Sequence, residues 1–222
     1  MSTITVTSEH QYDVVIGNDW LVELTSSISK YDRIAIFYSE SQKDHIPKLS
    51  VDNEIHYFAL PNGESAKSAQ TLAQMWDWMG AAGFTRSDLV VAIGGGTITD
   101  AAGFLSATWL RGIDWIAIPT TLAGMVDASV GGKTGINSDY GKNLIGAFHS
   151  PRKVIIDSKW LKTLSDRDIA AGLAEVIKTG FIGDQSILDL MENFELERDR
   201  NNYEVINQLI EKSVTVKSGV VS

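Results

Sequence analysis

The sequence of 222 residues contains no cysteine, which excludes disulfide bonds, thiolate metal sites and a cysteine nucleophile. It also contains no run near the roughly 18 apolar residues that a membrane-spanning helix requires. The first residues, MSTITVTSEHQYDVV, lack the basic and apolar regions of a secretory signal. We therefore expect a soluble, cytoplasmic protein that has no membrane partner.

Basic residues are in the minority, with 19 lysines and arginines against 28 aspartates and glutamates and a net charge of -9 at pH 7. Nucleic-acid binding needs clustered lysine and arginine to neutralise phosphates, so nucleic acid is not expected as a partner. This balance says nothing about small anionic ligands, which respond to local charge. A hydrophobic share of 44% and a charged share of 21% are ordinary for a globular protein with a sizeable core.

Short apolar segments alternate with helical patterns through the first 156 residues. The segments Thr3–Val6 and Tyr12–Ile16 are spaced to pair as a hairpin. Ser65 is predicted to cap the helix that follows it. Further strands are predicted at 33–38, 54–60, 89–93, 115–118 and 154–156. This alternation is typical of βαβ units and predicts an α/β fold, with a Rossmann-like, mainly parallel sheet and flanking helices.

Only helical patterns follow residue 156. Ser165, with Asp168 three residues later, resembles a capping box, and the helix behind it extends toward Gly180. Two more amphipathic helices are predicted around 187–191 and 205–216. We therefore place a domain boundary at Asp157, between a nucleotide-binding α/β domain (1–157) and the start of an all-helical domain (158–222).

A glycine-rich turn is predicted to join a strand to a helix within Leu89–Trp109. Gly94, Gly95 and Gly96 are expected to use positive φ angles, which glycine adopts without steric cost. The free N–H groups and the dipole of the following helix favour an anion here. Two interpretations stay open: a phosphate-binding corner for a nucleotide, and a turn that serves only chain geometry.

The segment from Asp127 to Phe148 interrupts the alternation and is predicted to be a long loop or hairpin at a site. Its Gly-Gly-Lys-Thr run does not match a P-loop, because the first glycine of that pattern would fall at Asp127. Lys133 and Lys142 lie on glycine-rich backbone as mobile positive charges. With the nearby polar side chains of Asp127 and Asn143, they suit a small phosphorylated and hydroxylated ligand. Solvated loop lysines are the alternative interpretation.

Glu175 and Lys178 are spaced like an i,i+3 ion pair on a helix surface. Their neighbours are small or apolar, so this helix is expected to be buried on most sides. A buried carboxylate needs a cation, a donor or a metal to offset its desolvation, which makes Glu175 a candidate metal ligand. The four histidines are scattered along the sequence and do not complete such a site.

Four motifs in order, GGGTITDAAGF, IPTTLAGMVDASVGGKTGIN, GKNLIGAFHSP and AGLAEVIK, resemble the 3-dehydroquinate synthase family. The resemblance extends from about Asn62 to Gly183. It implies an NAD-binding α/β domain, a helical C-terminal domain, and NAD+ with a divalent metal, zinc or cobalt, as cofactors. It also implies a homodimer that converts 3-deoxy-D-arabino-heptulosonate 7-phosphate into 3-dehydroquinate and phosphate in the shikimate pathway of aromatic amino acid biosynthesis. The implied steps are transient oxidation, phosphate elimination, re-reduction, ring opening and aldol closure.

The resemblance also implies roles for individual residues. Asn62 replaces a common aspartate of the family, and Thr99 replaces a usual glycine. The implied cofactor contacts are Asn62, Gly63, Glu64, Ser65, Ala66, Lys67, Gly95, Gly96, Thr97, Ile98, Thr99, Asp100, Thr120, Thr121, Lys133, Lys142, Trp160, Leu161, Lys162 and Thr163. The implied catalytic residues are Asp127, Lys133, Asn143, Lys178 and Arg111, the last matching an arginine that binds substrate phosphate, within its subunit or across a dimer interface. Glu175 matches the first metal ligand.

The family's two metal-binding histidines have no counterpart in this sequence. This predicts a truncated form that keeps the NAD-binding domain and is impaired in full catalysis. Three alternatives remain open: another sugar phosphate cyclase, a metal-dependent polyol dehydrogenase with a similar glycine turn, and an NAD-binding fragment without catalysis.

Overall fold

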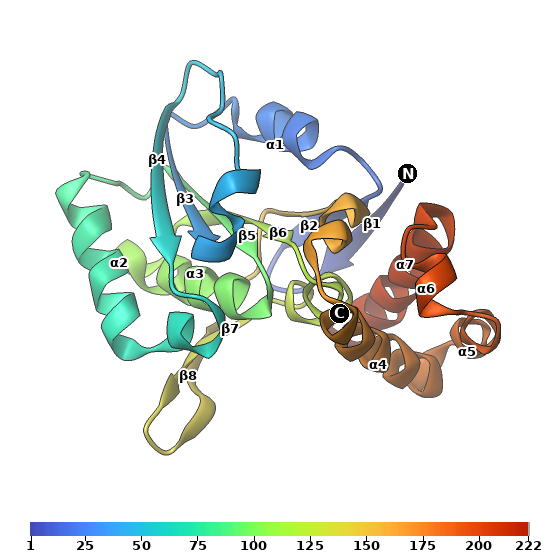
Figure 1. Cartoon of the computed structure of the whole chain (residues 1–222). Helices are drawn as coiled ribbons and strands as arrows, with labels where there is room; N and C mark the ends of the chain where they lie inside the picture. The colour runs from blue at the N-terminus through green and yellow to red at the C-terminus, as the bar shows by residue number, and fades with distance from the viewer. Residues whose placement is uncertain (222) are drawn as a thin grey trace.

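The fold is built on a seven-stranded sheet with the order β1-β2-β9-β6-β5-β3-β4 (Figure 1). The structure, a computed structural model, describes residues 1–221. β1 pairs antiparallel with β2, and the other neighbouring strands of this sheet are parallel. The strands are β1 (Ser2–Thr7), β2 (Gln11–Ile16), β3 (Arg33–Ser39), β4 (Glu54–Leu60), β5 (Leu89–Gly94), β6 (Asp114–Pro119) and β9 (Lys153–Ile156). The predicted mainly parallel sheet and its N-terminal hairpin are confirmed.

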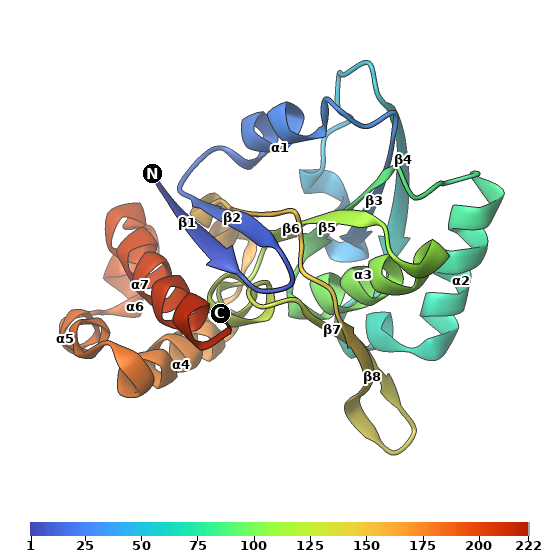
Figure 2. The ribbon, with the colours of Figure 1, turned by 180° about the vertical axis from the view of Figure 1, so that it is seen from behind.

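Helices cover both faces of this sheet. The central strand β5 is buried along its whole length, which is why its sequence is almost entirely aliphatic. α2 (Ala69–Ala81) and α3 (Gly96–Thr108) lie on one face, and α1 (Trp20–Ile28) lies on the other (Figures 1 and 2). Right-handed crossovers require this division, because the chain crosses the sheet in opposite directions from β2 to β3 and from β5 to β6.

A two-stranded sheet, formed by β7 (Lys133–Ser138) and β8 (Gly141–Phe148), projects from the α3 side of the molecule (Figure 2). β7 packs closely on α3, where a Cβ atom on Gly103 would lie 2.5 Å from the Thr134 side chain. The hairpin interpretation of this segment is therefore confirmed. The Gly-Gly-Lys-Thr run leads into a strand and not into a helix, so a P-loop is excluded.

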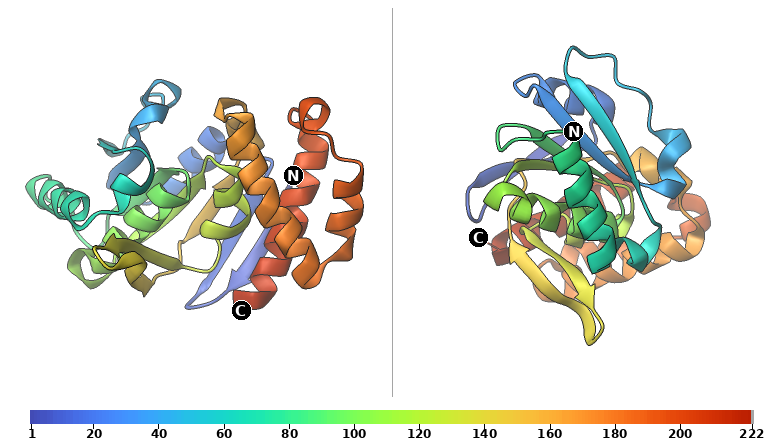
Figure 3. Two further views of the ribbon diagram at one scale, coloured as in Figure 1. Left: turned by 60° about the horizontal axis from the view of Figure 1, so that its bottom comes forward. Right: turned by 90° about the vertical axis from the view of Figure 1, so that its left-hand side faces the viewer.

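The C-terminal part of the chain is helical, as predicted. α7 (Tyr203–Val221) packs against β1 and β2, beside α4 and α5 (Figure 3). The short helix α6 was not predicted, and the boundary at Asp157 stays a prediction. In the described part of the chain, no helix is long and apolar enough to cross a membrane. The remaining helices are α4 (Asp166–Gly183), α5 (Gln185–Glu192) and α6 (Leu196–Asp199).

The predicted cap of α2 is wrong by one turn. Ser65 lies within a 3-10 turn, η2 (Gly63–Lys67), and α2 begins only at Ala69. The capping side chain is that of Ser68, whose hydroxyl accepts a hydrogen bond from the amide N–H of Thr71 at 3.0 Å. Two serines three residues apart offer the same capping chemistry, and packing of η2 against α3 decides between them.

Asp114, at the start of β6, accepts hydrogen bonds from the Tyr31 hydroxyl at 2.8 Å and from Arg152 at 2.7 Å. Burial alone would raise the pKa of Asp114, but these two donors outweigh it and hold the pKa below its usual range. A lowered pKa in the folded state stabilises the protein above pH ~4 and loses that effect as the pH falls through the lowered value.

We expect Asp114→Asn to lower the free energy of unfolding at pH 7, because the hydrogen bonds from Tyr31 and Arg152 lose their charged acceptor. The loss should be only about 1–2 kcal/mol, because Arg152 is half exposed and solvent screens its interaction. The difference from the wild type should shrink at an acidic pH below the lowered pKa of Asp114, because the wild-type carboxylate is then protonated. Urea unfolding at both pH values measures it, with Asp139→Asn in the exposed hairpin turn as the control. An equal penalty at both pH values would contradict the expectation.

Candidate functional site

A cavity of about 460 Å³ lies where α3, the β7–β8 hairpin, α7 and a π-helical turn, η4 (Gly124–Ala128), meet. Carboxylates and ammonium groups from all four elements line it. They come from segments up to 117 residues apart in sequence, Asp100 and Lys217 being the outermost. The charged and amide side chains of its lining are Asp100, Asp127, Lys133, Asn143 and Lys217.

The glycine turn lies at the carboxyl end of β5, at the start of α3. Its glycines do not use positive φ angles, so that expectation is wrong. Close approach explains them instead: a Cβ on Gly94 would lie 2.5 Å from the Ile98 side chain, and one on Gly95 would lie 3.0 Å from Thr121. Within residues 1–221, no acceptor receives the amide N–H groups of Gly96 and Thr97. These N–H groups and the helix dipole fit the pyrophosphate of a dinucleotide.

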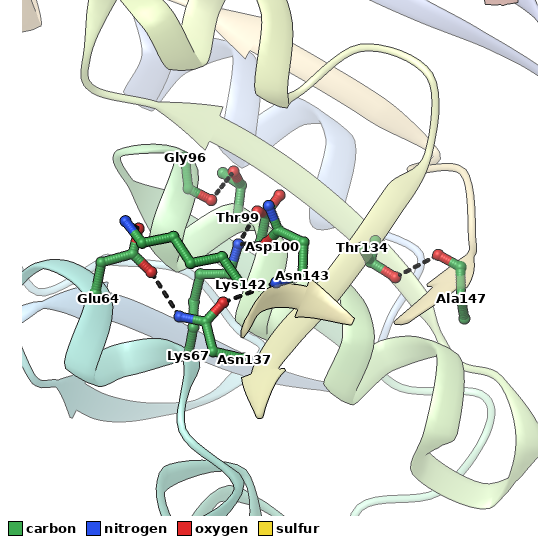
Figure 4. A network of polar contacts seen from close by, with 10 residues as sticks. All are labelled: Glu64, Lys67, Gly96, Thr99, Asp100, Thr134, Asn137, Lys142, Asn143 and Ala147. Carbon is green, nitrogen blue, oxygen red and sulfur yellow. Dashed lines mark hydrogen bonds and ion pairs between the residues drawn. The ribbon is translucent and has the colours of Figure 1, made fainter. Parts of the chain in front are cut away.

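A buried lysine, Lys67, connects the helix that follows the glycine turn, α3, to β8. Lys67, from η2, donates to Asp100 at 2.5 Å and also to the side-chain oxygen of Asn143 on β8 (Figure 4). Its side chain is 4% exposed. Burial raises the pKa of Asp100, and Lys67 opposes that shift. The ammonium thus compensates a carboxylate that stands on the first turns of α3.

Glu64, also in η2, bonds to the β7–β8 hairpin. Its carboxylate accepts hydrogen bonds from Asn137 at 2.6 Å and from Lys142 at 3.1 Å (Figure 4). The bond from Asn137, with that from Lys142, lowers the pKa of Glu64. Asn137 in turn accepts from the amide N–H of Asn143 at 2.9 Å. The structure therefore brings together the predicted residues of η2, α3 and β8.

Lys217, on α7, was missed by the sequence analysis. Its ammonium donates to Asp127 at 2.5 Å, across 90 residues of sequence. α7 has amphipathic periodicity and no motif that distinguishes this lysine from its neighbours, so no sequence signal pointed to it. Asp127 and Lys217 both line the cavity, together with Asp100 and Asn143, the two partners of Lys67.

Glu175 does not stand within a metal-binding cluster. The part of the chain that the structure describes holds no group of three histidine, aspartate or glutamate side chains that could bind a metal ion. Glu175 instead pairs with Lys178, and this bond raises the pKa of Lys178. A single carboxylate does not fit a tight zinc site.

The helix that carries Glu175 and Lys178 is α4, and the expectation that it is buried on most sides is wrong. Ala170, Ala171, Ala174 and Lys178 are exposed, and Phe181 and Ile182 are 77% and 62% exposed. Small and apolar residues are typical of a buried helix, but here several of them form an exposed helix face.

Other predicted residues lie outside the cavity. Arg111 is in η3 (Trp109–Arg111), with a left-handed backbone at φ 67°, at the end of α3 remote from the glycine turn. Residues 160–163 belong to η5 (Ser158–Thr163), beyond the carboxyl end of β9. The carboxamide oxygen of Asn62 accepts from the Ser39 hydroxyl at 2.8 Å, so it joins the ends of β3 and β4.

Sequence comparison assigns the chain to one family. The family description "3-dehydroquinate synthase N-terminal" matches residues 57–171, and "3-dehydroquinate synthase C-terminal" matches residues 172–222. The chain belongs to the 3-dehydroquinate synthase family. A 3-dehydroquinate synthase of Thermobifida fusca is 44% identical over 217 residues, which cover 95% of this chain and 59% of the relative. The chain thus spans about three fifths of the length of such relatives.

Solved structures agree on the fold. A 2-epi-5-epi-valiolone synthase from Streptomyces hygroscopicus, with NAD+ and Zn2+ bound, is 30% identical with a TM-score of 0.82, over 97% of this chain and 62% of that one. A 2-deoxy-scyllo-inosose synthase complexed with carbaglucose-6-phosphate, NAD+ and Co2+ also has a TM-score of 0.82, at 22% identity, over 99% and 63%. The second shows the fold alone.

We expect Lys67→Met to lower the free energy of unfolding by about 2–4 kcal/mol, because Asp100 would lose its buried counter-charge. Adding Asp100→Asn should recover part of that loss. Urea unfolding of the single and double variants measures the coupling. Lys142→Met is the control, since its ion pair with Glu64 is exposed and contributes at most about 1 kcal/mol. Equal losses in the two lysine variants would contradict the role of Lys67.

Proposed function

We propose that this chain acts in the 3-dehydroquinate synthase reaction, which turns 3-deoxy-D-arabino-heptulosonate 7-phosphate into 3-dehydroquinate and phosphate, in the cytoplasm. The family match over residues 57–222 carries the proposal. The cavity supports it, because lysines of two elements converge beside an anion-binding helix start, a charge distribution that suits a sugar phosphate next to a dinucleotide.

NAD is the proposed cofactor, as in the valiolone synthase of similar fold. When bound, its nicotinamide supplies a reversible hydride acceptor. The amide N–H groups at the start of α3 would bind the pyrophosphate, and Asp100 with Lys67 would orient the nicotinamide half. The remaining predicted cofactor residues stay part of this proposal.

The substrate would bind in the cavity that Lys133 and Lys217 line. Lys133 and Lys217 would bind its phosphate or hydroxyl oxygens, and Asp127 holds Lys217 in place at 2.5 Å. Ammonium groups stabilise the negative charge that develops on a leaving phosphate, and the ammonium of Lys217 is already held in place by Asp127. Asn143, already bonded to Lys67, would orient a ring hydroxyl.

A divalent metal belongs to the family resemblance, and structures of similar fold contain Zn2+ or Co2+. Residues 1–221 offer one matching carboxylate, that of Glu175, and it is paired with Lys178. Because this set does not form a tight site, we expect substrate and NAD binding to exceed turnover in this chain.

A homodimer is part of the proposal. Both faces of β8 are exposed, with Leu144, Ile145 and Phe148 at 63%, 42% and 70%. An exposed apolar strand edge favours pairing with another strand, and a second copy offers the same edge. Arg111 supports this arrangement, because the 13 residues of α3 separate it by about 20 Å from the glycine turn of its own subunit.

Phosphate release from the heptulosonate phosphate, with NAD+ and zinc, tests the activity. We expect release that depends on NAD+ and falls about 100-fold in Lys133→Met, since a positive charge at the leaving group is lost. Lys48→Met, an exposed lysine outside the cavity, should leave the rate unchanged. NAD binding by calorimetry without phosphate release would favour an NAD-binding fragment.

Two other products would reveal other enzymes. A valiolone or inosose formed from a different sugar phosphate would favour another cyclase, an alternative that the valiolone synthase at 30% identity keeps open. Net accumulation of NADH with a simple alcohol would favour a polyol dehydrogenase, because a cyclase restores NAD+ in each turnover.

We expect Ile145→Lys to shift the protein from dimer to monomer, because it would place charge on the proposed β8 edge. Light scattering after size-exclusion chromatography measures the mass. Val22→Lys on α1, where the wild-type side chain is 70% exposed, is the matched control and should leave the mass unchanged. A monomeric wild type would overturn the homodimer.

A further inference from the structure

A double-glycine turn, Gly131–Gly132, immediately precedes Lys133, one of the proposed substrate-binding groups. It follows η4 and leads directly into β7. Gly131 and Gly132 have φ angles of 105° and 66°, in the left-handed region that favours glycine. A Cβ on Gly132 would also lie 2.9 Å from the backbone nitrogen of Ser150. The turn can therefore carry no side chains that would fix it by packing.

Hydrogen bonds from outside hold this turn instead. The amide N–H of Gly131 donates to the hydroxyl of Tyr12, on β2, at 2.9 Å. The carbonyl of Gly132 accepts from the amide N–H of His149 at 2.7 Å. Tyr12 is 3% exposed, and burial raises its pKa, so the phenol is neutral and its oxygen remains available as an acceptor.

The β1–β2 hairpin also forms hydrogen bonds with Ser150, which follows β8 and lies against Gly132. The amide N–H of Ser150 donates to Glu9 at 2.7 Å, and the hydroxyls of Ser8 and Ser150 lie 2.6 Å apart. One hairpin, remote from the cavity in sequence, thus anchors both segments that meet at Gly132.

Lys133 depends on this anchor because its own side chain is free. It is exposed, and within residues 1–221 it has neither a hydrogen-bond nor an ion-pair partner. Its ammonium is therefore located by the backbone of β7, whose start is set by the Gly131–Gly132 turn.

We propose that Tyr12 is a positioning residue, whose hydroxyl fixes the Gly131–Gly132 turn and thereby places the Lys133 ammonium in the cavity. The consequence for substrate affinity rests on the proposed function, whereas the placement of Lys133 does not. Tyr12→Phe removes the acceptor and keeps the buried ring. Tyr31→Phe is the matched control, because it removes a buried tyrosine hydroxyl that bonds Asp114, away from the cavity.

The placement is tested on the whole chain with lysines reductively methylated by ¹³C-formaldehyde. The Lys133 signal is assigned by its loss in Lys133→Arg. We expect Tyr12→Phe to shift and narrow that signal, because the ammonium becomes more mobile, and Tyr31→Phe to leave it unchanged. An unchanged Lys133 signal in Tyr12→Phe, or equal changes in both tyrosine variants, would overturn the proposal.

Calorimetric titration with the heptulosonate phosphate in the presence of NAD+ tests the consequence. Tyr12→Phe should weaken substrate binding about 3- to 10-fold, and NAD binding should stay within about twofold. In a Lys133→Met background, Tyr12→Phe should add no further loss. An additional loss there would show that Tyr12 acts through another group. If the wild type does not bind the sugar phosphate, the proposed function fails, and the Lys133 signal alone decides the role of Tyr12.

Discussion

The ammonium of Lys67 is the group on which the arrangement of the site depends. It is buried at the junction of η2, α3 and β8, and it bonds Asp100 on one side and Asn143 on the other. In such a poorly solvated place each bond is strong, and an unpaired partner is costly. β7 packs on α3, whereas β8 exposes most of its side chains, so the position of β8 relative to the glycine turn depends on polar contacts. The Lys67 ammonium thus helps to hold β8 beside the start of α3.

A second carboxylate–lysine pair lines the cavity. Asp127 binds the ammonium of Lys217, as Asp100 binds that of Lys67. Each carboxylate lies near the glycine turn or η4, and each lysine comes from an element distant in sequence. Because the acids are neutralised in pairs, Lys133 remains as an uncompensated positive charge in the lining. Within residues 1–221, an anionic ligand would find Lys133 without a partner and Lys217 already held by Asp127, which suits recognition of a phosphate group at low reorganisation cost.

Much of the fold could be predicted because apolar periodicity reports local burial. The segments 33–38 and 89–93 are strands in the structure, and the Asp127–Phe148 segment contains a hairpin. Errors arose where two local solutions are nearly equal, as for the cap at Ser65 or Ser68, or where a glycine serves close approach and not a special φ angle. Lys217 could not be found, since its pairing with Asp127 spans 90 residues and depends on how α7 docks against η4.

Anion binding and metal-dependent chemistry need different arrangements of side chains in this chain. The groups suited to anions, namely the start of α3 and the lysines of the cavity, stand on elements that pack against one another within residues 1–221. Metal chemistry would require several ligands at one point, and residues 1–221 hold no group of three side chains that could bind a metal ion. Anion binding draws on dipoles and charges that a packed α/β sheet positions as a result of its topology. A tight zinc site needs three or four specific side chains at fixed distances. The carboxylate of Glu175, paired with Lys178, is accordingly stabilised in this chain by an ion pair that does not depend on a metal.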